Sequence, residues 1–141
     1  MSTGENARWA DGRLIELQDD ECWRLLTERA VGRVSWAGAV GQTILPVNYV
    51  VVDTEIWFRT TAHSSLSREV DELPVAFEID EVDDFTRSGW SVLVRGTAHV
   101  VFDATSLPRT WPGLETWPGG SHALHVAVRP IEVTGRRLLP S

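Results

Sequence analysis

The chain has 141 residues, of which 43% are hydrophobic, so it is the size of one domain and can bury a core. Its net charge of −7 argues against nucleic acid as a partner. A sequence without a long apolar run or a signal pattern predicts a cytoplasmic protein that does not contact a membrane. All 13 basic residues are arginine and one residue is cysteine, which excludes sites that require lysine, internal disulfides and cysteine metal clusters.

The N-terminal part is expected to contain a flexible segment, a helix and a strand. Residues 1–13 are polar and are predicted to be flexible, so that one folded domain spans residues 14–141. The spacing of apolar residues predicts a helix over Leu17–Arg29, with Asp19 as its N-cap and acidic residues in its first turn. Residues 31–37 are expected to form a short strand.

A hairpin is predicted next. The apolar segment 43–53 is long enough for a strand, and Pro46 within it indicates an edge, a bulge or a place left open for a ligand. The pair Asp53-Thr54 predicts a tight turn into a second strand over residues 55–60.

The middle of the chain carries the clearest strand pattern. A helix is expected over Ser65–Glu72, a strand over 74–80 and an acidic connection over 81–89. Residues 90–103 then alternate with a period of two, and Gly96 in their middle predicts a sharp bend. The residues expected on the buried face are Val92, Val94, Ala98, Val100 and Phe102.

The last part combines a loop with a closing strand. Residues 106–121 are rich in Pro, Gly and Trp and predict a loop, whereas His122–Leu138 predict a strand that Pro130 breaks or bulges. The chain thus has about six strands that follow one another without regular crossover helices, which favours an antiparallel sheet. A mainly β fold with flanking helices, specifically a six-stranded split barrel, protects the strand edges best.

The turn between residues 60 and 68 is the best candidate for a site. It collects hydroxyl and basic side chains, namely Arg59, Thr60, Thr61, His63, Ser64, Ser65 and Arg68. Such groups at a strand-to-helix turn are typical of anion binding. Helix capping by Ser64 or Ser65 with solvated neighbours remains open as the alternative.

Other patterns do not predict a site. His122 and His125 lie three residues apart in a predicted strand and therefore point to opposite faces, so no metal site is expected. Ser91 lacks the second glycine of a nucleophile elbow. The acidic residues from Glu78 to Asp84 lack the spacing of a calcium loop, and no G-x-G-x-x-G follows a strand.

Taken in order, several segments resemble the pyridoxamine 5′-phosphate oxidase-like family, the flavin-binding split barrels, in its shorter branch. The resemblance covers roughly Leu14 to Leu138 and is carried by "VGRVSW", "LPVNYVV", "FRTTAHSSLS", "VAFEIDEVDDFTRSGWSVLVRGTAHVV" and "VRPIEVTGRRL". It implies a homodimer that binds flavin mononucleotide (FMN) in a groove between the subunits.

The resemblance also implies the cofactor contacts. The strand that contains Pro46, Val47 and Asn48 is expected along the edge of the flavin ring. The residues expected at the phosphate or ribityl chain are Arg59, Thr60, Ser64, Ser65 and Arg68, and those expected near the ring, from the same or the other chain, are Trp90 and Ser91.

The sequence departs from the family pattern at one important place. Members of this branch commonly carry a motif like "FRTGPGSKL", whereas this chain has His63 at the last glycine and Ser65 at the lysine. The usual phosphate cation is therefore missing, and Arg68, one helical turn later, is expected to substitute for it.

These features predict an FMN-dependent oxidoreductase that transfers hydride to a small molecule whose identity the sequence does not define. A deazaflavin-dependent reductase is the alternative enzyme. A non-catalytic flavin-binding dimer, or a dimeric scaffold that has lost its cofactor, is the alternative without catalysis. If the reaction needs a general acid, His63 is the best candidate.

Overall fold

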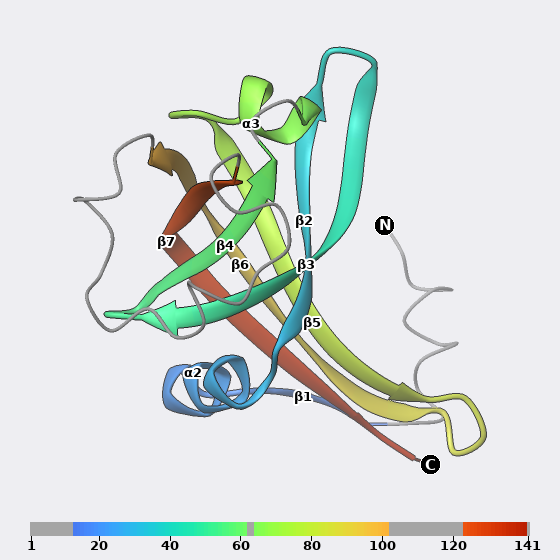
Figure 1. Cartoon of the computed structure of the whole chain (residues 1–141). Helices are drawn as coiled ribbons and strands as arrows, with labels where there is room; N and C mark the ends of the chain where they lie inside the picture. The colour runs from blue at the N-terminus through green and yellow to red at the C-terminus, as the bar shows by residue number, and fades with distance from the viewer. Residues whose placement is uncertain (1–12, 62–63, 102–122, 141) are drawn as a thin grey trace.

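An antiparallel sheet curls into a barrel, which closes because the last strand in the sheet order also pairs with the C-terminal strand. The computed structural model describes residues 13–61, 64–101 and 123–140. The strands are β1 (Arg13–Glu16), β2 (Val31–Gly38), β3 (Gly41–Val52), β4 (Glu55–Thr61), β5 (Pro74–Asp83), β6 (Ser88–Val101) and β7 (Ala123–Leu139), and the helices are α2 (Asp19–Glu28) and α3 (Ser65–Glu69). The sheet order is β1-β7-β4-β3-β2-β5-β6, and β6 pairs again with β7 (Figure 1).

This ring confirms the predicted mainly β split barrel, but the sheet has seven strands rather than six. The additional strand is β1, whose four residues pair with the C-terminal end of β7 from Arg13–Leu139 to Glu16–Arg136. All four residues of β1 are exposed, so they carry no alternation of buried and exposed positions. Pairing with a distant segment defines this strand, which explains why local patterns missed it.

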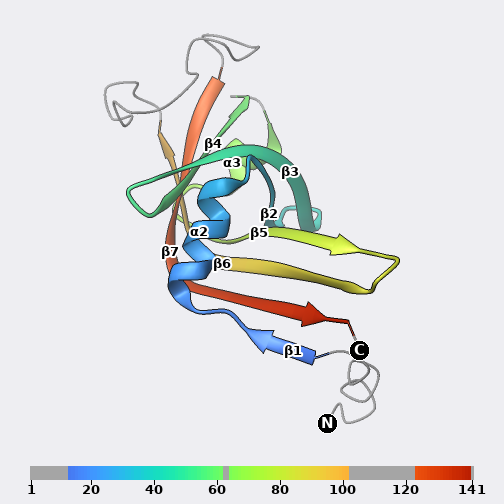
Figure 2. The ribbon, with the colours of Figure 1, turned by 90° about the horizontal axis from the view of Figure 1, so that it is seen from below.

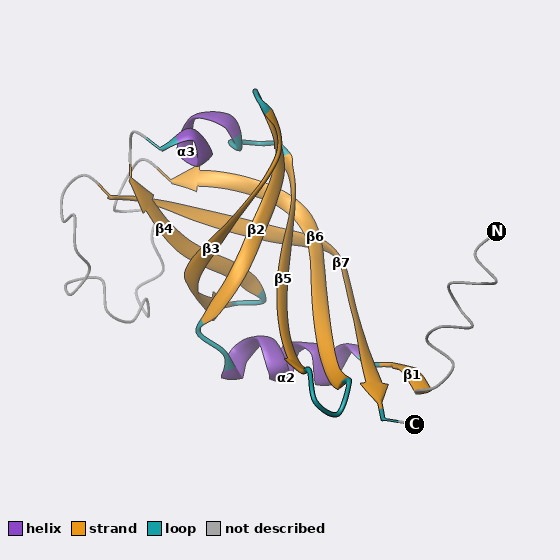
Figure 3. Cartoon of the chain, turned by 90° about the vertical axis from the view of Figure 1, so that its right-hand side faces the viewer, coloured by secondary structure: helices purple, strands orange, loops and turns teal. Residues whose placement is uncertain are grey.

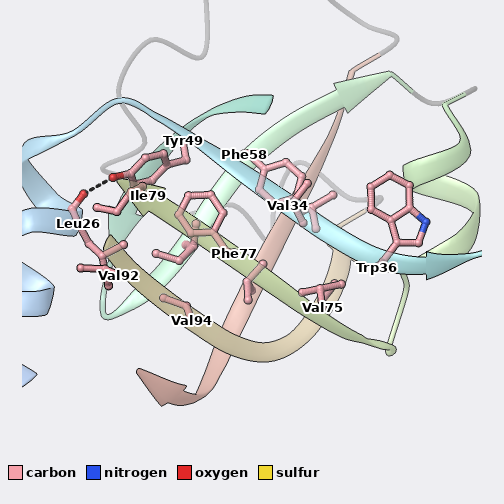
Figure 4. Packing of buried hydrophobic residues seen from close by; sticks show 14 of the residues in the cluster. Leu26, Val34, Trp36, Tyr49, Phe58, Val75, Phe77, Ile79, Val92 and Val94 are labelled. Carbon is pink, nitrogen blue, oxygen red and sulfur yellow. Dashed lines mark hydrogen bonds between the residues drawn. The ribbon is translucent and has the colours of Figure 1, made fainter. Parts of the chain in front are cut away.

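Helix α2 covers one end of the barrel, and α3 lies at the other end (Figure 3). The predicted N-cap of α2 was wrong: Gln18 occupies that position with an extended backbone and no side-chain cap, and Asp19 is the first helical residue. The acidic first turn still complements the helix dipole. Leu26 anchors the helix, because the buried Tyr49 hydroxyl donates a 2.6 Å hydrogen bond to its carbonyl (Figure 4).

The β5–β6 hairpin is longer than the sequence predicted. The acidic segment 81–89 was expected to be a connection, but the ladder continues to the Asp83–Ser88 pair. The Asp83 carboxylate accepts hydrogen bonds from the amides of Phe85 and Thr86, which stabilises the short turn. The hairpin extends beside the C-terminal half of β7 (Figure 2), so polar side chains here mark an exposed ladder rather than a loop.

The core fills the inside of the barrel, as Figure 4 shows. The alternation predicted for β6 is confirmed at Val92, Val94, Ala98 and Val100, which are all buried; Phe102 lies outside the described residues. None of the helices among the described residues is long and apolar enough to cross a membrane.

The bend predicted at Gly96 is confirmed as a register shift in the β6–β7 ladder. Arg95 pairs with Glu132 and Gly96 pairs with Pro130, so Ile131 is an additional residue on β7. A Cβ on Gly96 would lie 2.2 Å from the Arg129 carbonyl oxygen, so the close approach of the two strands requires glycine here.

Strands β3 and β4 separate after the Tyr49–Phe58 pair. Before this point β3 pairs with β2, from Gly41–Gly38 to Asn48–Val31. Beyond it, Arg59, Thr60 and Thr61 of β4 pair with β7. Within the described parts of the chain, the first part of β3 therefore has one edge without a partner strand, and Pro46 lies on this edge as its missing N–H requires.

Candidate cofactor site

The turn after β4 is built around a cluster of three hydroxyl groups. Ser64 is the N-cap of α3, and its Oγ accepts a 3.1 Å hydrogen bond from the Ser67 amide. The Thr60 Oγ1 lies 2.7 Å from the same oxygen, and the Ser64 hydroxyl lies 3.2 Å from the Ser67 hydroxyl. Capping thus accounts for Ser64, and the three side chains orient one another. His63 lies outside the described residues.

Helix α3 is shorter than predicted, because it ends at Glu69 rather than Glu72. Glu72 has a left-handed backbone with φ of 62°, and Pro74 follows two residues later, so the helix cannot continue. The Glu69 carboxylate accepts hydrogen bonds from the Trp36 indole and the Ala39 amide, which hold α3 against β2.

Two predicted residues of the turn, Ser65 and Arg68, face solvent. Arg68 forms no ion pair with any residue that the structure describes, whereas most arginines of the barrel surface are paired with carboxylates. Of the first amides of α3, that of Ser67 is capped by the Ser64 Oγ, whereas those of Ser65 and Leu66 have no intrahelical acceptor. The described residues of the turn therefore offer one exposed cation, Arg68, and backbone donors to an anion.

Arg59 is not directed at the hydroxyl cluster. Neighbouring residues of a strand point to opposite faces, so Arg59 and Thr60 project from opposite sides of β4. The Arg59 Nε donates a 3.0 Å hydrogen bond to the His125 Nε2 on β7, and both side chains are buried. Burial lowers the pKa of His125, and the charge of Arg59 lowers it further, so the imidazole is kept neutral and can accept.

Pro46, Val47 and Asn48 lie on the unpartnered edge of β3, immediately before β3 and β4 join. Pro46 and Asn48 are exposed, whereas Val47 packs partly against the core. The edge of a strand presents backbone N–H and C=O groups that are free to bind another molecule. The structure thus places these three residues immediately before the point where β3 joins β4, and the hydroxyl-rich turn follows β4 beyond that point.

Trp90 and Ser91 lie far from this turn within one chain. Trp90 is buried, pairs with Glu81, and has the Arg29 guanidinium 5.0 Å above its ring. Ala98, which bonds to the segment after α3, lies eight residues further along β6, up to about 26 Å measured along an extended strand. One chain therefore does not bring Trp90 and the turn together.

Sequence reasoning missed a charged cluster on the outer face of β2 and β5. Arg33 is 3.2 Å from both the Glu78 and the Asp80 carboxylates. Burial and then the neighbouring Asp80 together raise the pKa of Glu78 to about 7, although the charge of Arg33 acts in the opposite direction. The i, i+2 spacing of Glu78 and Asp80 places both carboxylates on one face of a strand, and the sequence could have shown this. The position of Arg33 beside them depends on the pairing of β2 with β5, which the sequence does not reveal.

These features define a class of protein, the split β-barrels that have an open strand edge beside a hydroxyl-rich turn. Residues 18–137 match the family model for pyridoxamine 5′-phosphate oxidase, and the chain belongs to this family. The family membership confirms the resemblance inferred from the sequence.

Individual relatives and solved structures are similar to the chain over most of its length. An uncharacterized protein of Mycobacterium tuberculosis is 36% identical over 131 residues, which cover 89% of this chain and 86% of the relative. The FAD-binding protein of Mycobacterium smegmatis is 32% identical with a TM-score of 0.67, and the match covers 89% of this chain and 98% of that one. A FAD-binding protein of Mesorhizobium loti, 20% identical over 88% of this chain and 97% of its own, shares the fold with a TM-score of 0.68.

Proposed function

We propose that the chain binds a flavin, with FMN as the first choice, and that it is an oxidoreductase that transfers hydride to a small molecule. The family and the similarity to the FAD-binding protein of M. smegmatis support flavin binding. The observation that carries the proposal is the divergence of β3 and β4, which leaves the edge of β3 at Pro46–Asn48 unpartnered on one strand, while the other strand leads to the turn that holds Ser64 and Arg68.

The residues present fit a flavin phosphate in part. A phosphate needs donors and positive charge; the turn supplies the first-turn amides of α3, the Ser65 hydroxyl and Arg68. Thr60 and Ser64 contribute mainly by fixing the shape of the turn, because their hydroxyls bond each other. Arg59 donates its Nε hydrogen to His125, and its positive charge also favours an anion at the end of β4.

The edge of β3 suits the flavin ring. The Asn48 N–H would hydrogen-bond the polar edge of the ring, because the Tyr49 N–H bonds Ala30 on the β2 side and the preceding residue therefore points to the unpartnered edge. Exposed Pro46 would cover part of the ring surface. The bound flavin supplies the hydride chemistry, and the chain holds and orients it.

A second copy of the chain is part of the proposal. Trp90 and Ser91 are too distant to approach a flavin held at the turn of their own chain, so a partner chain would have to present them. Several large apolar side chains are exposed, including Ile44, Leu45, Val82, Phe85 and Ile131, and a subunit interface would bury such residues. The proposed assembly is therefore a homodimer with the flavin between its subunits.

FAD and a deazaflavin are the competing cofactors. The similarity to the FAD-binding protein of M. smegmatis favours FAD. The second phosphate and the adenosine of FAD can make additional contacts, so the affinity for FAD depends less than that for FMN on a cation at position 65. A flavin-binding protein without turnover remains the alternative function, since the described residues include no convincing general acid at the turn.

Absorbance of the purified protein tests the proposal. We expect a flavin spectrum as purified or after addition of FMN, with weaker binding of riboflavin, which lacks the phosphate. Titrations with FAD and a deazaflavin rank the cofactors, and oxidation of the reduced cofactor by candidate acceptors tests turnover. Failure of every flavin and deazaflavin to bind would refute the proposal, and binding without turnover would support the non-catalytic alternative.

A further inference from the structure

Three potential metal ligands converge on the outer surface where the segment after α3 meets β6. They are Asp71, Glu72 and His99, and their ligand atoms all lie within 4.8 Å of one another. The His99 Nδ1 hydrogen-bonds the Glu72 Oε1 and lies 3.9 Å from the Asp71 Oδ1. We propose that these three side chains bind a divalent metal ion, of which Zn²⁺ is the best fit, at a site separate from the flavin.

The donor set agrees with zinc. One imidazole nitrogen and two carboxylate oxygens are ordinary zinc ligands, and water can complete a tetrahedron. Two ligands of one tetrahedral zinc ion lie about 3.4 Å apart. Shifts of about 1 Å in exposed side chains would bring the three atoms to this spacing. Magnesium prefers an octahedron of oxygen ligands and is a poor match for a site that includes imidazole.

The backbone around the cluster is already ordered. The Asp71 Oδ1 accepts a 2.8 Å hydrogen bond from the Val100 amide, which leaves its second oxygen for a metal. The Glu72 amide donates to the Ala98 carbonyl at 2.8 Å, and the Ala98 amide donates to the Leu73 carbonyl at 3.0 Å. The ligands from the two segments are thus held together without the metal, which lowers the entropy cost of binding.

The charge of the cluster also favours a cation. Among the described residues, no arginine forms an ion pair with Asp71 or Glu72, whereas Glu78 and Asp80 share Arg33, and Glu132 has Arg95. Two carboxylates beside one imidazole remain net negative even when the imidazole is protonated. The side chains of Asp71, Glu72 and His99 are 42%, 63% and 40% exposed, so an ion can enter from solvent.

Calorimetric titration of the full chain, first treated with a chelator, tests this site. We expect one Zn²⁺ per chain and no competition from Mg²⁺. Mutation of a residue that only hydrogen-bonds a metal ligand lowers metal affinity by about tenfold or more. Loss of a ligand itself should have at least this effect, so His99→Gln and Glu72→Gln should each weaken zinc binding by about tenfold or more. Glu132→Gln is the matched control, since it removes an exposed carboxylate that pairs with Arg95, and it should bind zinc like the wild type.

A second variant separates metal binding from folding. Asp71→Asn keeps an oxygen for the Val100 amide but loses the charge, so its melting temperature without zinc should stay close to that of the wild type while zinc binds more weakly. Zinc should raise the melting temperature of the wild type and not that of His99→Gln. The proposal is overturned if the wild type binds no zinc, or if His99→Gln and Glu72→Gln bind it as tightly as the wild type, which would place the metal on other histidines.

Discussion

At the scale of single residues, the site depends on which side chains supply positive charge at the turn after β4. Arg59 is buried and hydrogen-bonded to His125, whereas Arg68 is exposed and has no ion pair with the described residues. This chain has Ser65 at the position where the family branch that its sequence resembles commonly has a lysine. Charge at the turn therefore rests on Arg68, and flavin affinity should respond to changes at these two positions.

Substitution Ser65→Lys should tighten FMN binding by about tenfold, because it adds one charge-assisted contact to the phosphate. Arg68→Ala should weaken FMN binding for the opposite reason. The gain from Ser65→Lys should shrink as salt is raised, since the charge pair is partly exposed. Titration of each variant followed by flavin fluorescence measures these affinities.

Riboflavin is the control for this experiment because it has the same ring and no phosphate. Neither substitution should change its affinity. If Ser65→Lys leaves FMN binding unchanged, or improves riboflavin to the same extent, this turn does not hold the phosphate.

The charged cluster of Arg33, Glu78 and Asp80 should make stability depend on pH. The pKa of Glu78 rises from its ordinary value of 4.5 to about 7 in the folded chain. Between these values the folded protein binds a proton that the unfolded chain has released, so the free energy of unfolding falls as pH rises through this window. Glu78→Gln should remove this loss, which we expect to be about 1 kcal/mol because the side chain is one third exposed.

Urea denaturation at about pH 5 and about pH 8 measures this effect. Glu132→Gln, which alters an exposed carboxylate elsewhere, should keep the wild-type dependence. An equal pH dependence in Glu78→Gln and the wild type would show that Glu78 does not titrate in this window.

At the scale of elements, the β6–β7 ladder closes the barrel, and this ladder contains a β-bulge at Gly96. The additional residue Ile131 on β7 lets the long strand bend around the core, and the backbones approach closely at Gly96. This bulge is therefore a structural requirement for closure of the barrel.

Gly96→Ala should lower the free energy of unfolding by about 2 kcal/mol or more, because the added methyl would lie 2.2 Å from a backbone oxygen that cannot easily move. Chemical denaturation of the variant and the wild type measures the difference. Thr97→Ala is the control on the same strand, with an expected loss below about 1 kcal/mol. A Gly96→Ala variant as stable as the control would mean that the ladder relaxes at the bulge without cost.

At the scale of the whole molecule, the open edge of β3 and the exposed apolar side chains favour assembly. Ile44 is 62% exposed and lies two residues before Pro46 on that edge, where the proposed flavin meets both subunits. Stable dimers usually bury about 1,200–2,000 Å² or more, so one charge at the centre of the interface should be disruptive.

Light scattering at micromolar concentration should give twice the chain mass of 15.7 kDa for the wild type. Ile44→Arg should shift the protein toward the monomer and weaken flavin binding together with it, because the site needs both chains. Thr27→Arg, an exposed change on α2, should remain a dimer. A wild type that is monomeric at this concentration would contradict both the homodimer and the shared site.

Local patterns determined a large part of this fold. The period-two alternation of β6, the spacing of α2, the Asp53-Thr54 turn and the glycine at the bulge are properties of neighbouring residues, and the structure agrees with each. The hydroxyl-rich turn was also visible, since its residues are close together in the chain. Errors at the N-cap of α2 and at the end of α3 concerned one or a few residues at helix ends, where helix and turn conformations differ little in energy.

Pairing between distant segments decided the remainder. Short β1 becomes a strand because β7 offers it an edge, and the acidic end of β5 stays in the ladder because β6 continues beside it. The contact of Arg59 with His125, and the meeting of Asp71 and Glu72 with His99, each follow from the register between elements. A side chain's neighbours across a sheet depend on this register, and a shift of one residue reverses the face on which it lies, so only the tertiary structure could place these groups together.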